Sequence, residues 1–384
     1  MNISRLSNHY RHLHQFPEPG FKEFLTQNYL KSVLESQTAL NVFPVAGTGL
    51  LIFKKGNPGK RTIAFRADMD GLPLHENTGL AYSSKHPGFM HSCGHDGHMA
   101  ILLELILNTA ELDLRNNYLF IFQPAEEGPG GASEIIADRR FQEMLPEIIF
   151  GLHVHPSLPA GGIGCKSGSF FAGVSEFHIS IQGREAHAST GDPCNALLGG
   201  VEGICQTMEA LAKLESQPEN VSIKEKHLLH FGRINSGIKE NIIAASAQID
   251  GTLRAFSPDR KKWLKDTLYR EFEDSTKKRN LKLNLSFNCD YPVLINAKPA
   301  VEILKKVCQT AGIHFQDLPD FFLGEDFAFY LEKIPGAFFL LGVNDTDCSG
   351  NLHTANFSYN PSALATGVNL FQKIVEFLES RDRA

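Results

Sequence analysis

The segment MHSCGHDGHMA, residues 90–100, concentrates side chains that bind metals or take part in catalysis. One cysteine, three histidines and one aspartate lie within eight positions, separated by glycines and small residues. The glycine between Cys93 and His95 lets the backbone turn sharply enough for both side chains to reach one metal site. The thiol could instead be a nucleophile activated by His95 or His98. A polar loop with an incidental cysteine is the third interpretation, and this segment alone does not decide among them.

A pair of adjacent glutamates favours the metal interpretation. Glu126 and Glu127 closely follow the apolar stretch NYLFIFQ. Two carboxylates at the end of an apolar strand are costly to bury without partners, and a cation is the usual compensation. In a metallohydrolase, one such carboxylate binds the metal and its neighbour accepts the proton of the attacking water. For this motif taken by itself, a solvated acidic loop is the alternative.

Three further segments carry side chains that can bind a metal. Asp68 and Asp70 end the stretch RTIAFRADMD, where a carboxylate could bind a metal or orient a ligand histidine. His153 and His155 lie two apart on an expected strand and therefore share a face. His353 follows in a loop near the C-terminus. Each histidine alone fits a structural role, but five such clusters in one chain favour a common metal site.

Alternating helices and strands are expected to position these clusters. The predicted helices cover residues 8–16, 23–37, 99–112 and 132–145, and the predicted strands cover residues 48–55, 61–70, 116–123 and 147–156. This alternation is typical of a layered α/β sheet, in which ligands gather at the carboxyl ends of the strands. Three of these strand ends carry the candidate metal ligands.

The pattern changes from about Phe171. GVSEFHISIQG alternates apolar and polar residues, which predicts an antiparallel sheet with one open face. The elements that follow have the order β-α-β-β-α-β, which describes a ferredoxin-like unit. Helices and strands of the first type then resume. We therefore predict one α/β domain formed by residues 1–170 and 290–384, interrupted by a smaller inserted domain at residues 171–289.

Composition bounds the class of partner. The chain has 384 residues, a net charge of -6 and no basic run, which argues against binding to nucleic acid or to an anionic membrane. Neither a signal peptide nor an apolar segment long enough to span a bilayer is expected, so we predict a cytoplasmic protein that acts on small molecules. The seven cysteines are scattered and odd in number, which predicts reduced thiols rather than a disulfide framework.

Motifs along almost the whole chain carry a resemblance to one family. In order, they are LHQFPEPGFKE, RADMDGLPLHENTGLAY, GFMHSCGHDGHMA, FQPAEEGPGGA, GLHVHP, GREAHAS, ENIIAASAQIDGTLR, FLGEDFAFY and LHTANFSYN. With these motifs the chain resembles the amidohydrolase branch of the dinuclear metallopeptidase family. That branch includes hippurate hydrolase, N-acetyl-diaminopimelate deacetylase and auxin-conjugate hydrolases, and it is related to aminoacylase and glutamate carboxypeptidase. Each motif alone is weak, but the set in this order is highly specific.

The resemblance implies a fold and a set of site residues. The fold would be a mixed-sheet α/β catalytic domain with an inserted ferredoxin-like α+β lid. Two divalent metal ions, zinc or manganese with cobalt or nickel as further candidates, would be held by Cys93, His95, Glu127, His153 and His353. Glu126 would be the general base, and Asp70 would orient a ligand. The lid would present His187, Asn241 and Arg254 to the substrate, and the resemblance allows a homodimer through this domain.

The reaction that follows is hydrolysis of an N-acyl amino acid to a carboxylate and a free amino acid. His187 would stabilise the oxyanion, and Arg254 would pair with the substrate carboxylate. A dinuclear aminopeptidase or dipeptidase, a metal-binding relative without catalysis and a cysteine amidase are the alternatives. The presence of Glu126 beside Glu127 argues against mere binding, because a binding site has no use for the base. The sequence assigns no role to His91, His98 or His155, and Asp96 is only a candidate for orienting a ligand.

Overall fold

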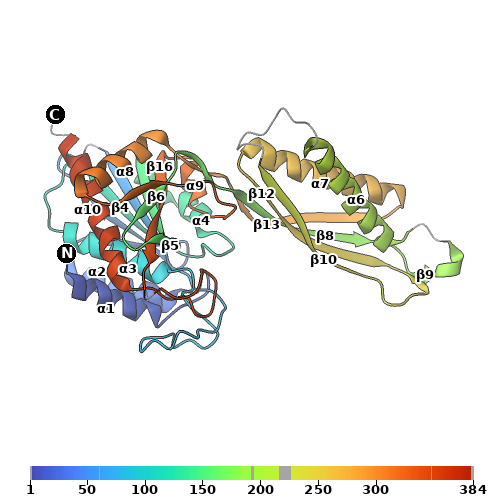
Figure 1. Ribbon diagram of the computed structural model, residues 1–384, viewed down its shortest axis with the longest axis horizontal. Helices are drawn as coiled ribbons and strands as arrows, with labels where there is room; N and C mark the ends of the chain where they lie inside the picture. Colours follow the sequence, from blue (N-terminus) through green and yellow to red (C-terminus); the bar gives the residue numbers. More distant parts are fainter. Residues whose placement is uncertain (1, 60, 192–193, 216–225, 347, 382–384) are drawn as a thin grey trace. The chain divides into compact units, whose positions relative to one another are not determined.

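The computed structural model describes residues 2–59, 61–191, 194–215, 226–346 and 348–381, and Figure 1 shows its two units. Unit 1 comprises Met1–Phe170, Ile295–Pro319 and Asp326–Ala384, and unit 2 comprises Phe171–Leu294 and Asp320–Glu325. The first division falls at the predicted boundary after residue 170. The chain returns to unit 1 at Ile295 rather than at residue 290. The short segment Asp320–Glu325, predicted for the first domain, belongs to unit 2.

Unit 1 is built on an eight-stranded mixed sheet with the order β1-β2-β4-β3-β5-β16-β6-β15. Its strands are β1 (Asn41–Val45), β2 (Gly49–Lys54), β3 (Thr62–Asp68), β4 (Asn117–Gln123), β5 (Ile148–Pro159), β6 (Ile163–Cys165), β15 (Phe315–Asp317) and β16 (Gly336–Asn344). The central strands β4, β3, β5 and β16 are parallel, whereas β1 and β2 are antiparallel. The prediction of a mixed α/β sheet is confirmed.

The parallel strands bring the candidate residues to one edge of the sheet. β3 and β4 are buried almost throughout, as expected for parallel strands covered on both faces. Asp68 at the end of β3 lies in register with Gln123 at the end of β4. The segments that carry Asp70 and the glutamate pair therefore leave the sheet side by side.

Helices pack around this sheet. They are α1 (Ile3–His14), α2 (Phe24–Gln37), α3 (His95–Thr109), α4 (Gly131–Ala137), α5 (Arg139–Glu143), α8 (Lys298–Ala311), α9 (Ala328–Leu331) and α10 (Leu364–Arg381), with a 3-10 turn η3 (Pro361–Ala363) before the last. α3 is buried along nearly its whole length, because it contacts α1, α2 and α10 as well as the strands. No helix in the described ranges is both long and apolar enough to cross a membrane.

Three helices differ from the prediction. α1 begins at Ile3 rather than at residue 8, because the side chain of Asn2 caps it there by accepting a hydrogen bond from the Arg5 N–H. α3 begins at His95 rather than at residue 99, because Gly94 takes a left-handed conformation with φ of 87° and starts the helix inside the motif. The predicted helix at residues 132–145 is two helices, α4 and α5. They divide at Asp138, which is extended and accepts a hydrogen bond from the Arg140 N–H at the start of α5.

Unit 2 has the predicted β-α-β-β-α-β order. Its main elements are β8 (Gly173–Gln182), α6 (Ala196–Glu215), β10 (His227–Ser236), β12 (Ser246–Ala255), α7 (Pro258–Lys278) and β13 (Lys282–Tyr291). The four strands form an antiparallel sheet with the order β10-β12-β8-β13, which α6 and α7 cover on one face (Figure 1). Its short elements are β9 (Ala186–His187), η1 (Ala188–Thr190) and β11 (Ile242–Ile243). The divisions of the chain between the two units fall within β7 (Gly168–Phe171) and β14 (Leu294–Asn296).

Candidate metal centre and catalytic residues

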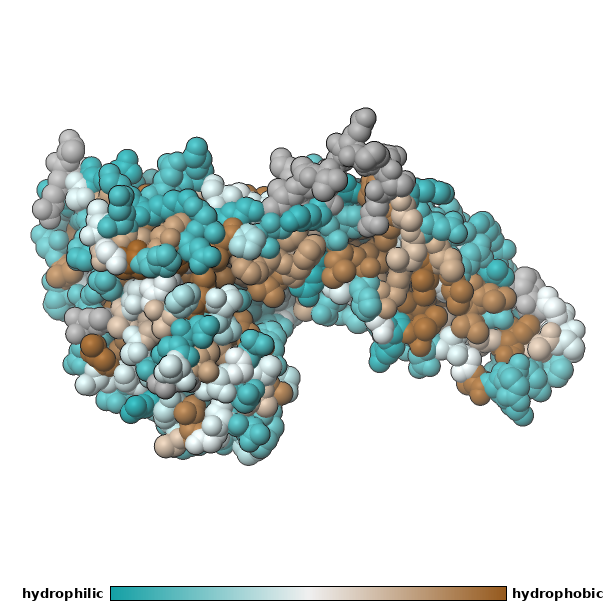
Figure 2. All heavy atoms as spheres, in the orientation of Figure 1, coloured by the Kyte–Doolittle hydropathy of each residue, from teal (hydrophilic) through white to brown (hydrophobic). Residues whose placement is uncertain are grey.

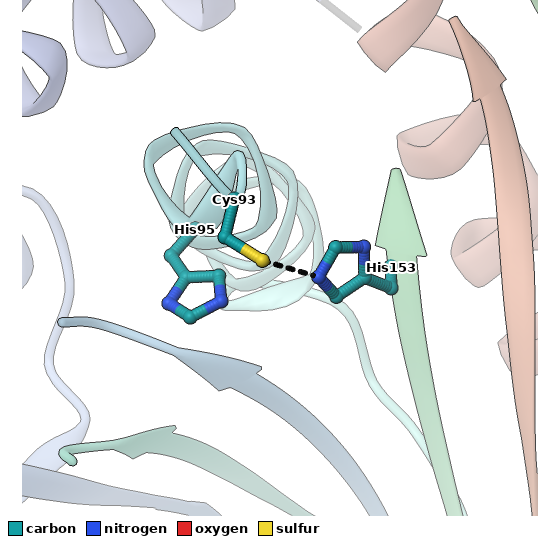
Figure 3. A group of neighbouring side chains, drawn as sticks. All are labelled: Cys93, His95 and His153. Atoms are coloured by element: carbon teal, nitrogen blue, oxygen red, sulfur yellow. Dashed lines mark hydrogen bonds between the residues drawn. The ribbon is translucent and has the colours of Figure 1, made fainter. Parts of the chain in front are cut away.

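Cys93 lies at the centre of a group of metal-binding side chains in unit 1. Its Sγ is 3.2 Å from Nε2 of His153 and 3.2 Å from Nε2 of His353. Figure 3 shows Cys93, two residues before α3, and His95, the first residue of α3, converging with His153 of β5. The ligand atoms of these three residues lie within 4.8 Å of one another, as do those of Cys93, Glu127 and His353. The thiol belongs to both groups, so the arrangement offers two adjoining metal positions.

The ring nitrogens of His95 and His153 are oriented for metal binding. Nδ1 of His95 is 2.9 Å from the backbone oxygen of Asp70, and Nδ1 of His153 is 2.6 Å from that of Val154. A carbonyl oxygen can only accept, so each Nδ1 carries a hydrogen, and in the neutral imidazole that a metal ligand requires each Nε2 keeps its lone pair. This leaves both Nε2 atoms available as ligands, with the backbone fixing the ring orientation.

One buried atom of the group, Nε2 of His95, lacks a hydrogen-bond partner in the part of the chain that the structure describes. Oε1 of Glu127 lies 3.1 Å from Nε2 of His353, so these two ligand candidates face each other. Buried polar atoms without partners are rare because they cost free energy. A thiol, three imidazoles and a carboxylate also form a donor set suited to late divalent metals. The residues present therefore fit a pair of metal ions.

The electrostatics around Cys93 oppose a role as nucleophile. Burial raises the pKa of the thiol well above its ordinary value, and the charges of Glu127 and Glu126 raise it further. Reactive cysteines have the opposite surroundings, with positive charge nearby. A thiolate at this position requires a nearby cation to offset its charge, and a bound metal ion would be that cation.

Asp70 connects the glutamate pair to His95. Its Oδ1 accepts a hydrogen bond from the backbone N–H of Glu126 at 3.0 Å, and its Oδ2 accepts one from that of Glu127 at 2.9 Å. Oδ1 also lies 3.3 Å from Nδ1 of His95. One buried carboxylate thus orients the general-base candidate and a ligand candidate together.

His98, to which the sequence assigned no role, forms hydrogen bonds with the segments that carry the ligand candidates. Its Nδ1 is 2.6 Å from Oδ1 of Asp68, and its Nε2 accepts a hydrogen bond from the Val154 N–H at 2.8 Å. Both ring nitrogens are therefore in use, so His98 is not available as a ligand. It holds the backbone of β5 directly after His153.

Arg66, Gln123 and Asp326 form a buried network that sequence reasoning missed. Arg66 donates to Asp68 at 2.7 Å and to Asp326 at 2.8 Å, and Gln123 also donates to Asp326. All four side chains are almost completely buried. The available signal was a single arginine within an apolar strand, since a buried charge requires a partner.

Asp96 has a structural partner on α1. Its Oδ2 lies 2.6 Å from Nδ1 of His14, whose Nε2 is 3.3 Å from Glu76. Burial alone would lower the pKa of His14, but hydrogen bonds to Asp96 and Glu76 outweigh it and raise the pKa to about 9. His91 is buried nearby, and burial lowers its pKa to about 4. Nδ1 of His155 lies 2.7 Å from the hydroxyl of Ser157.

The three predicted substrate residues all lie in unit 2. His187 is exposed on β9, with Nδ1 2.7 Å from the hydroxyl of Ser189. Asn241 is its neighbour, because the Ala188 N–H donates to the Asn241 carbonyl and β11 pairs with β9. Arg254 lies near the far end of β12, where its guanidinium donates to the backbone oxygen of Phe322. Unit 2 brings His187 and Asn241 together and holds Arg254 apart from them.

Comparisons with known proteins identify relatives over nearly the whole length. The family model for peptidase family M20/M25/M40 matches residues 64–376. The N-acetyldiaminopimelate deacetylase of Exiguobacterium sibiricum is 35% identical over 364 residues, which cover 94% of this chain and 95% of that protein. The enzyme of the same name from Listeria monocytogenes is 34% identical, covering 97% and 98%.

A solved structure extends the likeness to the fold. The Bacillus subtilis YXEP protein, described as a dinuclear metal binding peptidase from the M20 family, superposes with a TM-score of 0.82. It is 27% identical in sequence, and the match covers 98% of each chain. The fold described above is therefore shared along the whole chain.

Proposed function

The chain belongs to the M20/M25/M40 peptidase family and is an amidohydrolase, and from that premise we propose that it hydrolyses N-acyl-L-amino acids. The observation that carries the proposal is the convergence of Cys93 and His95 with His153, His353 and Glu127 around two adjoining positions. Relatives named N-acetyldiaminopimelate deacetylases at 34–35% identity support an acylated amino acid as substrate. N-acetyl-diaminopimelate is accordingly the first candidate.

We assign two divalent metal ions to Cys93, His95, Glu127, His153 and His353. When bound, the ions supply the Lewis acidity that makes a water molecule acidic enough to react near neutral pH. The thiol and imidazole donors favour zinc, and the carboxylate also suits manganese, with cobalt and nickel as further candidates. Cys93 belongs to both ligand groups, so its thiolate would be part of the set that holds the ions.

Glu126 acts as the general base in this proposal. Its carboxylate accepts a proton from the water that attacks the amide carbonyl, and it returns the proton to the nitrogen of the leaving amine. The new carbon–oxygen bond forms first, as the carbonyl oxygen becomes an oxyanion; the carbonyl then re-forms as the carbon–nitrogen bond breaks, leaving a carboxylate and a free amino acid. Asp70 holds the backbone of Glu126 and so sets the direction of the base.

Substrate contacts are assigned to unit 2. We propose that His187 stabilises the oxyanion, that Asn241 assists it, and that Arg254 pairs with the substrate carboxylate through two parallel hydrogen bonds. The exposure of His187 and its position next to Asn241 support this assignment. Arg254→Lys keeps the charge but loses the paired geometry, so it should raise KM for acyl amino acids more than it lowers kcat.

An apolar surface on unit 2 supports a homodimer. Six apolar side chains of α6 and of the edge strand β10 are each between 38% and 48% exposed: Leu197, Leu198, Val201, Met208, Leu228 and Ile234. Figure 2 shows the brown surface that runs along α6. An edge strand beside an exposed apolar stripe is a ready site for pairing with a second copy. Light scattering should report a dimer that Val201→Glu converts to monomer, whereas Leu112→Glu on unit 1 should leave it intact.

A hydrolysis screen tests the proposed function. The metal-free chain is reconstituted with zinc, manganese, cobalt or nickel and given acetyl, benzoyl and longer-chain acyl amino acids, with unblocked dipeptides in parallel. We expect release of the free amino acid from at least one acyl substrate. Cleavage of dipeptides alone would favour the aminopeptidase alternative, and metal binding without any hydrolysis would favour a non-catalytic relative.

A further inference from the structure

The backbone that carries the general base begins with an unusual residue. Ala125 directly precedes Glu126 and has φ of 56°, a left-handed conformation that side-chain-bearing residues rarely adopt. Such a conformation persists only where the surroundings fix it. The Ala125 carbonyl accepts hydrogen bonds from the N–H groups of Gly130 and Gly131, at 3.0 and 3.1 Å. The N–H of Ala125 requires a separate hydrogen-bond acceptor.

The side chain of Glu23 is that acceptor. The Ala125 N–H donates to Oε1 of Glu23 at 2.9 Å, and the hydroxyl of Thr48 donates to Oε2. Glu23, Thr48 and Ala125 are all 0% exposed. Three consecutive backbone N–H groups, those of Ala125, Glu126 and Glu127, therefore donate hydrogen bonds to buried carboxylates. The acceptor is Glu23 for the first and Asp70 for the other two.

A helix-capping role does not account for Glu23. It occupies the N-cap position of α2, but its side chain makes no capping hydrogen bond there. Glu18 caps the helix instead, accepting from the N–H groups of Leu25 and Thr26 at 3.1 and 2.9 Å. The two nearby carboxylates therefore have different roles. Glu18 caps α2, and Glu23 accepts a hydrogen bond from the loop that carries the general base.

Burial of the Glu23 carboxyl group also costs free energy. Burial raises the pKa of its carboxyl group to about 7, although the hydrogen bond from Thr48 opposes the rise. A neutral glutamine would fill the same space without burying a charge. Glu23 is thus buried at a cost in free energy while it accepts the hydrogen bond from the Ala125 N–H.

We propose that Glu23 is a positioning residue for the general base, fixing the Ala125 N–H and thereby the direction in which Glu126 leaves the loop. The inference rests on the proposed function, in which Glu126 accepts the proton. The Glu23 carboxylate accepts hydrogen bonds from the Ala125 N–H and the Thr48 hydroxyl, so it acts through the backbone of Ala125. Misdirection of a base by about 1 Å lowers a rate by up to about 100-fold.

Hydrogen exchange of the metal-loaded chain tests the geometry without any substrate. In Glu23→Ala, the peptide containing residues 124–128 should exchange about tenfold faster or more, and Thr48→Val should shift it in the same direction. Glu23→Gln keeps an acceptor for Ala125 and should exchange like the wild type. Glu18→Ala is the matched control, because it should loosen the start of α2 and leave the loop unchanged. Unchanged exchange of this peptide in Glu23→Ala would overturn the inference.

Kinetics test the consequence for catalysis. Glu23→Ala should lower kcat about 10- to 100-fold while KM and the two bound metal ions stay unchanged, and Glu23→Gln should restore most of the rate. In a Glu126→Gln background the same change should have no further effect, since the group being positioned is gone. A full additional loss in that background, or loss of metal from Glu23→Ala, would show a general structural role and overturn the inference. Absence of hydrolysis by the wild type would refute the proposed function, and the exchange result would still decide the role of Glu23.

Discussion

The buried contact of His14 with Asp96 ties α1 to the first turn of α3, and its strength should depend on pH. The His14 side chain is 3% exposed, and its pKa of about 9 stands above the ordinary 6.5. A raised histidine pKa stabilises the fold fully below pH 6.5, and this stabilisation is lost as the pH rises through 9. The difference between the two pKa values corresponds to about 3 kcal/mol in the free energy of unfolding.

His14→Gln removes this charge, so the free energy of unfolding of unit 1 should fall by about 3 kcal/mol at pH 6. At pH 10 the ionic part of the difference should be close to zero, because His14 is then neutral in both states. Urea unfolding of the metal-free wild type and variant at the two pH values measures this, followed by circular dichroism. The single tryptophan, Trp263 on α7 of unit 2, provides an internal control, because its fluorescence transition should not shift. A stability difference that is the same at pH 6 and pH 10 would refute the ionic interpretation.

Three further predictions concern the residues around the metal centre. Arg66→Met leaves the carboxylates of Asp68 and Asp326 buried without their cation, so the free energy of unfolding should fall by about 3–5 kcal/mol in urea; a loss below about 1 kcal/mol would contradict the pairing. His98→Ala should weaken metal binding about 10- to 100-fold in competition with a chelator, and unchanged affinity would argue against its role behind His153. A chelator should abolish hydrolysis, and bound metal should protect Cys93 from alkylation; activity that survives the chelator but not alkylation would favour a cysteine nucleophile.

Several candidate site residues could be predicted because their positions follow from general features of the fold. Asp70 and the pair Glu126 and Glu127 come directly after apolar strands, and parallel strands end at the same edge of a sheet. Convergence at that edge does not depend on exact element boundaries. His353 was a candidate by its residue type, and the resemblance assigned it as a ligand; it comes from a loop that no periodicity could have placed beside Cys93.

The supporting interactions could not be predicted because their partners are far apart in sequence. Arg66 and Asp326 are separated by 260 positions, and His98 acts on the backbone of Val154, which has no side-chain signature. The start of α3 was misplaced for a local reason. The left-handed conformation of Gly94 turns a segment that reads as a loop into the first turn of a helix.

Reconstitution of the metal-free chain with cobalt tests the central claim most directly. Titration should show two Co²⁺ ions bound per chain, with a sulfur-to-cobalt charge-transfer absorption that is lost in Cys93→Ser, and deacetylation should return as the sites fill. Glu126→Gln should bind the same two ions with the same absorption and remain inactive. Full activity without bound metal, or binding that leaves the Cys93 sulfur uncoordinated, would contradict the account.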